Sequence, residues 1–246
     1  MSSKSYKDYH QTEKIDSSKV KTQFTLKSCY AFPLSSPQAR RDLIFGSLLL
    51  YTLLIGWIFN LGHRLDVVHR AFHGQAPIYR GFSPLSRTFK RGLQAFLAIG
   101  IYLTPAALCS GLSYLMYPHD IFYLVALLAT FLFLIAIYSL PGGMTYNAAF
   151  HEISYLYRPD KALKRAYQAG RPYLRAWLIG LSAIFLSLLT LAFGVFIFDR
   201  PQSPVDWMVC VFAMELFFLV SVWAWNVVGY AFSLAIVYRD REVNLH

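Results

Sequence analysis

The amino-acid sequence predicts an all-α, polytopic helical membrane protein, and three observations favour this class. Hydrophobic residues make up 56% of the 246 residues and charged residues only 15%, whereas about a quarter of an ordinary soluble domain is charged. Several apolar runs reach the roughly 20 residues that a helix needs to cross a bilayer. The runs lack the alternation of polar and apolar residues that marks a membrane β-barrel. We therefore expect about five transmembrane helices.

The chain divides by composition into three parts. Residues 1–41 are polar and basic and lack the apolar core of a secretory signal, so we expect a flexible or surface-bound N-terminal tail. Residues 42–238 form the predicted helical membrane domain, and residues 239–246 form a short C-terminal tail. The apolar runs of the membrane domain lie at Leu43–Asn60, Gly92–Tyr117, Ile121–Leu140, Leu174–Phe198 and Trp207–Tyr238.

Basic residues predict the topology of these runs. The N-terminal tail and the loops Arg64–Arg91 and Arg158–Arg175 are basic. The connections Tyr117–Asp120 and Asp199–Pro204 are short and poor in net positive charge. By the positive-inside rule, the long basic loops are cytoplasmic and the short connections lie outside. The C-terminal residues then fall on the cytoplasmic side.

The first apolar run conflicts with this rule. Arg40 and Arg41 precede the run and Arg64 and Arg70 follow it, so both of its ends favour the same side. Two solutions remain open. The run crosses the membrane with the N-terminal tail outside, or it enters and leaves the same leaflet around Gly56. A re-entrant segment needs protein or water around its bent backbone, so five spans is the simpler interpretation.

A weak internal repeat relates two parts of the membrane domain. "RGLQAFLAIG" (residues 91–100) aligns with "RPYLRAWLIG" (residues 171–180), and the apolar run upstream of each ends in "GWIFNLGH" or "LPGGMTYN". We interpret these small-residue or asparagine stretches as helix breaks. The repeating unit is a helix, a basic amphipathic segment and a second helix, at about 42–117 and 121–198. An extra helix follows at 206–238.

The same residues carry a family resemblance. Between Ser36 and Tyr238 the chain resembles a prokaryotic family of multi-pass membrane proteins classed as a domain of unknown function. The family has a Gly-rich first helix, an Arg-containing continuation, a short G-x-x-P loop, a polar segment and a G-L helix with a proline. Here these elements are Gly56, Arg64/Arg70, Gly74–Pro77, Phe82–Lys90, Gly92/Leu93 and Pro105. The basic "IYRGFSPLSRTFKR" replaces an acidic, Trp-containing loop common in the family. The resemblance implies a helical membrane fold and no established activity.

Histidines suggest two kinds of ligand site. His69 and His73 in "HRLDVVHRAFH" are four residues apart and share a helix face, a spacing that can present two imidazoles to one metal ion. His63, His69 or His151 is instead a candidate axial ligand of a haem or a chlorophyll. The alternative interpretation of the segment is an interfacial helix whose basic side chains contact lipid headgroups. No specific motif indicates a cofactor.

Glu215 is the most unusual residue of the apolar runs. It lies near the middle of "MVCVFAMELFFLVSVWAWN", where an unpaired carboxylate is costly. We therefore expect it to face a polar partner or a cavity, or to carry a proton. The candidate partners are Asn226, Asn60, Asn147, His63 and His151. A proton or ion pathway and a structural hydrogen bond between helices both remain open.

The formal net charge of +10 favours a membrane surface as the partner of the basic loops. In a membrane protein such charge contacts anionic lipid headgroups on the cytoplasmic side rather than nucleic acid. The residues expected at this interface are Arg64, Arg70, Arg87, Lys90, Arg91, Lys164, Arg165, Arg171 and Arg175.

The functional hypotheses follow from these residues and from the absence of familiar motifs. No P-loop, dinucleotide-binding, nucleophile-elbow or zinc-protease motif occurs in the sequence. This absence argues against an enzymatic function. The leading hypothesis is an accessory, assembly or scaffold subunit of a larger complex in a prokaryotic inner or internal membrane, with other membrane protein subunits as partners. One alternative is a small transporter or proton/ion-conducting protein that uses Glu215. The other is a pigment- or haem-binding protein that uses His63, His69 or His151.

Overall fold

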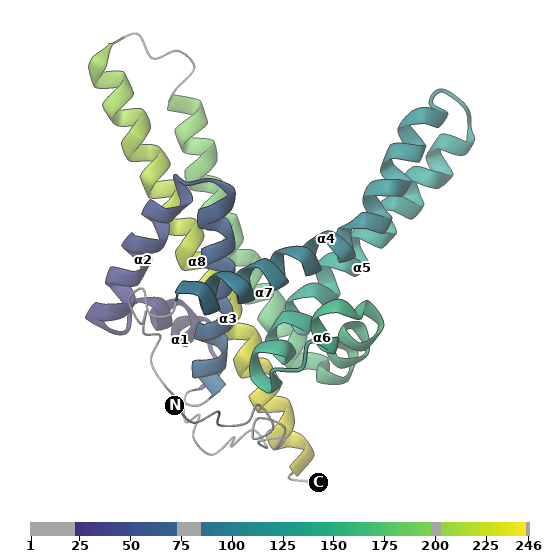
Figure 1. Cartoon of the computed structure of the whole chain (residues 1–246), viewed down its shortest axis with the longest axis horizontal. Helices are drawn as coiled ribbons and strands as arrows, with labels where there is room; N and C mark the ends of the chain where they lie inside the picture. The colour runs from purple at the N-terminus through teal and green to yellow at the C-terminus, as the bar shows by residue number, and fades with distance from the viewer. Residues whose placement is uncertain (1–22, 73–84, 198–202, 245–246) are drawn as a thin grey trace, which may run out of the picture.

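A computed structural model of the chain describes residues 23–72, 85–197 and 203–244, and the secondary-structure elements in these ranges are all helices (Figure 1). Four of them, α4, α5, α7 and α8, are long and apolar enough to cross a membrane. The chain is therefore an all-α, polytopic membrane protein as predicted, with four such helices in the described part rather than about five. The elements are α1 (Leu26–Ala31), the 3-10 helix η3 (Phe32–Leu34), α2 (Pro37–Leu50), α3 (Leu54–Phe72), α4 (Leu85–Met116), α5 (Ile121–Phe150), α6 (Ser154–Tyr157), α7 (Pro159–Ile197) and α8 (Pro204–Asn244).

Two helical hairpins project from one end of the molecule and diverge (Figure 1). The α4–α5 arm, formed by the C-terminal part of α4 and the N-terminal part of α5, and the α7–α8 arm, formed by the C-terminal part of α7 and the N-terminal part of α8, point to the same side and separate along their length. The opposite end, here called the base, holds α1, α6 and the C-terminal end of α8. The four long helices therefore run alternately away from the base and back to it.

The first apolar run is not a single helix, so the expected fifth span over Leu43–Asn60 is wrong. Helix α2 ends at Leu50, a turn follows at 51–53, and α3 returns from Leu54. The turn closes with Leu53 in the left-handed conformation, at φ 52°. The side-chain amide of Asn60 then joins the two helices by donating to the carbonyl oxygens of Gly46 (3.0 Å) and Gly56 (2.9 Å).

This α2–α3 hairpin corresponds to the re-entrant alternative, with its turn at 51–53 instead of around Gly56. Its tip packs on α8, where Tyr51 contacts Phe218 edge to face and Ser47 contacts Glu215. Glu215 lies 11 residues into α8, or about 16 Å from its N-terminal end at 1.5 Å per residue. The tip of the hairpin therefore packs well inside the apolar part of α8. Because the hairpin returns to the base, Arg40 and Arg41 in the first turns of α2 lie on the same side as the arginines of α3, which removes the conflict over charge.

Helix α3 runs without interruption through Asn60, so the break expected in "GWIFNLGH" does not form. The glycines of this region serve close packing instead. A Cβ atom on Gly62 would lie 1.9 Å from the carbonyl oxygen of Thr88, and one on Gly92 would lie 1.8 Å from that of Ile58. The backbones of α3 and α4 therefore touch at this crossing. The contact fixes the position of α4 at the point from which the α4–α5 arm extends.

Helix α5 likewise continues through the proline and glycines of "LPGGMTYN", so the second expected break is also wrong. Tyr173 of α7 explains the continuity. Its hydroxyl donates to the carbonyl oxygen of Tyr138 (2.5 Å) and accepts from the backbone N–H of Gly142 (3.1 Å). In a regular helix these two groups bond to each other as residues i and i+4. The tyrosine hydroxyl therefore bridges the turn that Pro141 opens.

The N-terminal tail is shorter than the expected residues 1–41, because aromatic residues from Phe24 onward pack on α8. The backbone N–H of Phe24 donates to the hydroxyl of Tyr238 (3.0 Å). Phe32 stacks on Tyr230 with ring centroids 3.7 Å apart. Residues 1–22 lie outside the described part. At the other end, α8 continues to Asn244, so most of the expected C-terminal tail belongs to this helix.

Gly170, at φ 59°, divides α7 into a basic segment (residues 159–169) and the membrane-crossing segment. This kink gives the basic segment a direction of its own at the base. The internal repeat stays a prediction, since neither of its helix breaks is present.

Candidate functional site

Glu215 is held by the α2–α3 hairpin instead of by the expected asparagines and histidines. The hydroxyl of Ser47 donates to Glu215 Oε1 at 2.5 Å, and the hydroxyl of Tyr51 also interacts with the carboxylate. The second oxygen, Oε2, is buried and has no hydrogen-bond partner among the described residues. The carboxyl group is therefore stabilised on one side and has unused hydrogen-bonding capacity on the other.

Three of the partners expected for Glu215 gather around a neighbouring pocket. Asn60 and His63 of α3 and Asn226 of α8 line a cavity of about 240 Å³ between the hairpin and α8. Glu215 is one helical turn from Phe218, which also lines this cavity. The remaining lining residues are Leu50, Trp57, Arg64, Phe217, Ser221, Val222 and Trp225. The pocket is thus mainly apolar, with a few polar groups that converge from α3 and α8.

Arg64 is the only cation among the residues that line this pocket. Its guanidinium lies over the ring of Trp225, 5.6 Å from the centroid, a cation–π contact. Arg64 therefore faces the bundle, whereas the sequence suggested a lipid-headgroup contact. Asn147 lies at the end of α5, where its amide donates to the carbonyl oxygen of Glu152 (3.1 Å).

The structure brings two of the candidate histidines together at the base. The rings of His69 and His151 lie 4.6 Å apart between centroids, and His69 Nδ1 is 3.0 Å from the carbonyl oxygen of Ala148. Arg91 of α4 donates to Asp66 of α3 and contacts His151 Nδ1 at 3.1 Å. This cluster of two imidazoles, one guanidinium and one carboxylate ties α3, α4 and the end of α5 to one another.

The surroundings of His151 in this cluster favour the neutral form of its imidazole ring. Burial lowers the pKa of His151 to about 4, and the charge of Arg91 acts in the same direction. A neutral Nδ1 accepts the hydrogen bond that the guanidinium donates. In residues 23–72, 85–197 and 203–244 no three His, Cys, Asp or Glu side chains lie close enough to hold a metal ion. His73, the second residue of the expected metal pair, lies outside these ranges.

The other basic residues expected at the lipid interface have different surroundings. Arg175 lies over the ring of Phe24, 5.1 Å from the centroid, while Arg70 is half-buried. Arg87, Lys90 and Arg171 are exposed. The expected interface is therefore a mixture of solvent-facing cations and cations held inside the fold.

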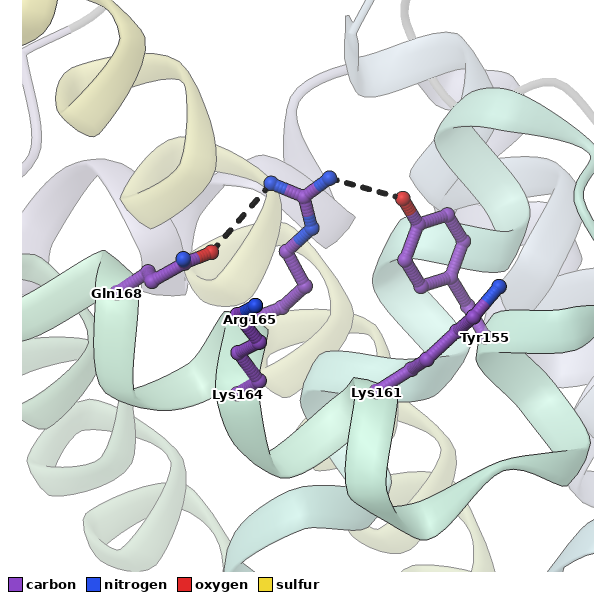
Figure 2. A pocket seen from close by; sticks show the side chains of 5 residues that line it. All are labelled: Tyr155, Lys161, Lys164, Arg165 and Gln168. Atoms are coloured by element: carbon purple, nitrogen blue, oxygen red, sulfur yellow. Dashed lines mark hydrogen bonds between the residues drawn. The ribbon is translucent and has the colours of Figure 1, made fainter.

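Lys164 and Arg165 line an open cleft at the base, together with Tyr155, Lys161 and Gln168 (Figure 2). The cleft has a volume of about 300 Å³. Tyr155, Lys161 and Gln168 were not among the site residues expected from the sequence, although the spacing of residues 161, 164, 165 and 168 places them along one side of a helix.

Comparisons with known proteins found no matching family model, no matching curated protein and no matching solved structure.

Proposed function

We propose that this protein is a non-enzymatic subunit of a larger membrane complex, with an accessory or scaffold role. The observation that carries the proposal is the face of α4 that contains Gly100, Thr104, Ala107 and Gly111. These four small residues are exposed, and their spacing of four, three and four places them on one face of the helix. We call this surface the small-residue face.

The two glycines have no packing role among the described residues of the chain. A Cβ atom added at Gly100 or at Gly111 would meet nothing within 4 Å, in contrast to the crossing at Gly92. The hydroxyl of Thr104 donates to the carbonyl oxygen of Gly100 at 2.7 Å, so the threonine is folded back on its own helix. The small-residue face is therefore flat, and its glycines relieve no crowding inside this molecule.

A flat face of this kind suits close contact with another transmembrane helix. Hydrophobic burial does not drive helix association in lipid, so association depends on van der Waals packing, which small residues improve by letting backbones approach. The divergence of the two arms leaves this part of α4 accessible along the α4–α5 arm (Figure 1). We infer that a helix of a different membrane protein packs on the small-residue face.

The test is purification of the full chain from its native membrane in mild detergent. We expect the wild-type protein to migrate as a complex larger than a single 28.1 kDa chain. The double variant Gly100→Leu/Gly111→Leu should lose the partner, because two leucines hold the helices apart.

Thr130→Leu on α5 is the matched control, since Thr130 is an exposed residue of the same arm outside the small-residue face. This variant should keep the partner. Migration of the wild-type protein as a lone chain would remove the proposal, and so would a complex that contains only copies of this chain or one that survives the double variant.

A second candidate function is a small transporter or proton-conducting protein. The observation that favours it is the half-satisfied carboxyl group of Glu215, one turn from a pocket with polar groups. Intramembrane carboxyl groups commonly mark proton or ion pathways. Proton flux into proteoliposomes is the measurement that decides between this function and a purely structural role.

For either function we propose the same orientation, with the base on the cytoplasmic side of a prokaryotic inner or internal membrane. The supporting observation is that the basic segments of α2, α3, α4 and α7 all lie toward the base, which the positive-inside rule places in the cytoplasm.

A further inference from the structure

We propose that the cleft at the base binds a phosphate group of the kind carried by anionic phospholipid headgroups and by soluble phosphate compounds. Five residues of α6 and of the basic segment of α7 form the cleft, and three of them are cations (Figure 2). This inference concerns a different surface from the small-residue face and does not depend on it.

Arg165 is fixed in place before any ligand binds. Its guanidinium contacts the hydroxyl of Tyr155 (3.1 Å) on one side and donates to the side-chain oxygen of Gln168 (3.4 Å) on the other. The same group lies 5.6 Å from the ring centroids of both Tyr146 and Tyr155. A planar guanidinium held in this way loses little conformational freedom when it binds an oxyanion, and its geometry matches a phosphate group.

The charges of the cleft do not balance. The carboxylate of Glu152 lies 3.4 Å from the ammonium of Lys161, and a hydrogen bond from Ser154 keeps the pKa of Glu152 below its ordinary value. This carboxylate offsets one of the three cations. The ion pairs recorded in the described part of the chain include neither Lys164 nor Arg165. An anion of one or two charges would therefore complete the site.

Phosphate fits the donors better than a carboxylate does. Two ammonium groups and a forked guanidinium from one helix line the cleft, and the Tyr155 hydroxyl adds a further polar group (Figure 2). A phosphate group offers several acceptor oxygens in a tetrahedral arrangement, so it can satisfy donors from more than one direction. The cleft volume of about 300 Å³ also leaves room for the group that carries the phosphate.

The experiment uses the full chain in detergent and three probes. Phosphatidylglycerol supplies an anionic headgroup, phosphatidylcholine supplies a zwitterionic headgroup, and inorganic phosphate supplies the free anion. Lipid occupancy is read by native mass spectrometry, and phosphate binding is read by the shift of the thermal midpoint. We expect the wild-type protein to prefer phosphatidylglycerol or to bind inorganic phosphate. The first result assigns the cleft to a lipid headgroup, and the second alone assigns it to a soluble phosphate compound.

The variants are Lys164→Gln and, as a matched control, Arg171→Gln. Each removes one exposed positive charge from α7, but Arg171 does not line the cleft. We expect Lys164→Gln to weaken binding of the preferred probe by up to about fivefold, the upper end for one exposed charge contact, and Arg171→Gln to leave it unchanged. Equal losses in both variants would mean diffuse attraction and would overturn the proposal. The proposal would also fail if the wild-type protein showed no preference for phosphatidylglycerol over phosphatidylcholine and no binding of inorganic phosphate.

Discussion

The carboxyl group of Glu215 is a candidate for two roles, a structural hydrogen bond between helices and the transfer of a proton. Oε1 accepts a hydrogen bond from Ser47, which ties α8 to the tip of the α2–α3 hairpin. Oε2 is buried and has no hydrogen-bond partner among the described residues, and the proposed proton pathway would use this oxygen. A glutamine can replace the first role but cannot carry a proton.

We predict that Glu215→Gln keeps the fold and abolishes any proton flux. The glutamine side-chain oxygen can still accept from Ser47, so the free energy of unfolding should change by less than about 1 kcal/mol. Flux is measured in proteoliposomes with a pH-sensitive dye, and stability is measured by the thermal midpoint in detergent.

Ser47→Ala provides the reverse control for this prediction. It should lower stability by about 1 kcal/mol, the net contribution of a typical hydrogen bond, and leave the flux intact. If Glu215→Gln conducts as well as the wild-type protein, the transport function is excluded.

The sequence identifies the special residues of this site better than it identifies their partners. Glu215 is visible because it interrupts an apolar run, but Ser47 lies 168 positions away and has no distinguishing pattern. Asn60, His63 and Asn226 were singled out as possible partners of Glu215 and line a common pocket beside it. The pairing of His69 with His151 could not be foreseen, because it depends on how α3 and α5 meet at the base.

At the scale of the element, helix α5 depends on a side chain from another helix. Pro141 lacks a backbone donor, and the sequence therefore suggested a break at this point. The hydroxyl of Tyr173 restores the hydrogen bonding by bridging Tyr138 and Gly142. Gly142 provides the space, because a Cβ atom there would lie 3.0 Å from that hydroxyl.

We predict that Tyr173→Phe destabilises the protein by about 1–3 kcal/mol. The substitution leaves a buried N–H and a buried carbonyl group without the bridging hydroxyl, and unsatisfied groups of this kind cost about that much. The change is measured as a lower thermal midpoint of the purified protein.

Tyr138→Phe is the appropriate comparison for this prediction. Tyr138 belongs to the same aromatic cluster, and its ring packs on Tyr173 with centroids 5.2 Å apart. Its hydroxyl makes no hydrogen bond with another described residue, so its removal should change stability little. Equal effects of the two substitutions would argue that the bridging hydroxyl is unimportant.

Element boundaries were predicted well where composition changes and poorly where it does not. The ends of the long helices near Tyr117 and Ile121 follow from the polar connection between them. The turn at residues 51–53 lies inside "LLLYTLLIG", which contains no proline and reaches glycine only after the turn. The flanking arginines gave the only indication of a re-entrant segment. Because charge is costly to move across a membrane, arginines at both ends of the run favour the same side.

At the scale of the whole molecule, the α2–α3 hairpin leaves four helices in the described part that are long and apolar enough to cross the membrane, and both described ends of the chain lie at the base. A chain with five crossings would instead place the residues before α2 on the opposite side from the basic segment of α7. The two arrangements therefore differ in which residues share a side of the membrane.

We predict that Gln38→Cys and Arg171→Cys react with an impermeant maleimide from the same side, and that His119→Cys reacts from the other. The background replaces Cys29, Cys109 and Cys210, the three native cysteines. Labelling is measured in sealed vesicles of known orientation.

Leu53→Cys at the hairpin tip is the internal control for this topology. It should stay unlabelled from both sides, because we expect the tip, which packs on the apolar part of α8, to lie within the hydrocarbon. Labelling of Gln38→Cys and Arg171→Cys from opposite sides would contradict a re-entrant hairpin and support a first helix that crosses.

The contacts of the N-terminal segment with α8 also set the order in which the molecule can be completed. Phe24 binds Tyr238 across 214 positions, and Trp223 donates to the carbonyl oxygen of Tyr30 at 3.2 Å. During synthesis, residues 24–32 emerge long before their binding surface on α8 exists. They can make these contacts only after the last helix has been synthesised. A chain truncated before α8 would keep these aromatic residues exposed, which gives proteases a direct way to distinguish an incomplete molecule from a finished one.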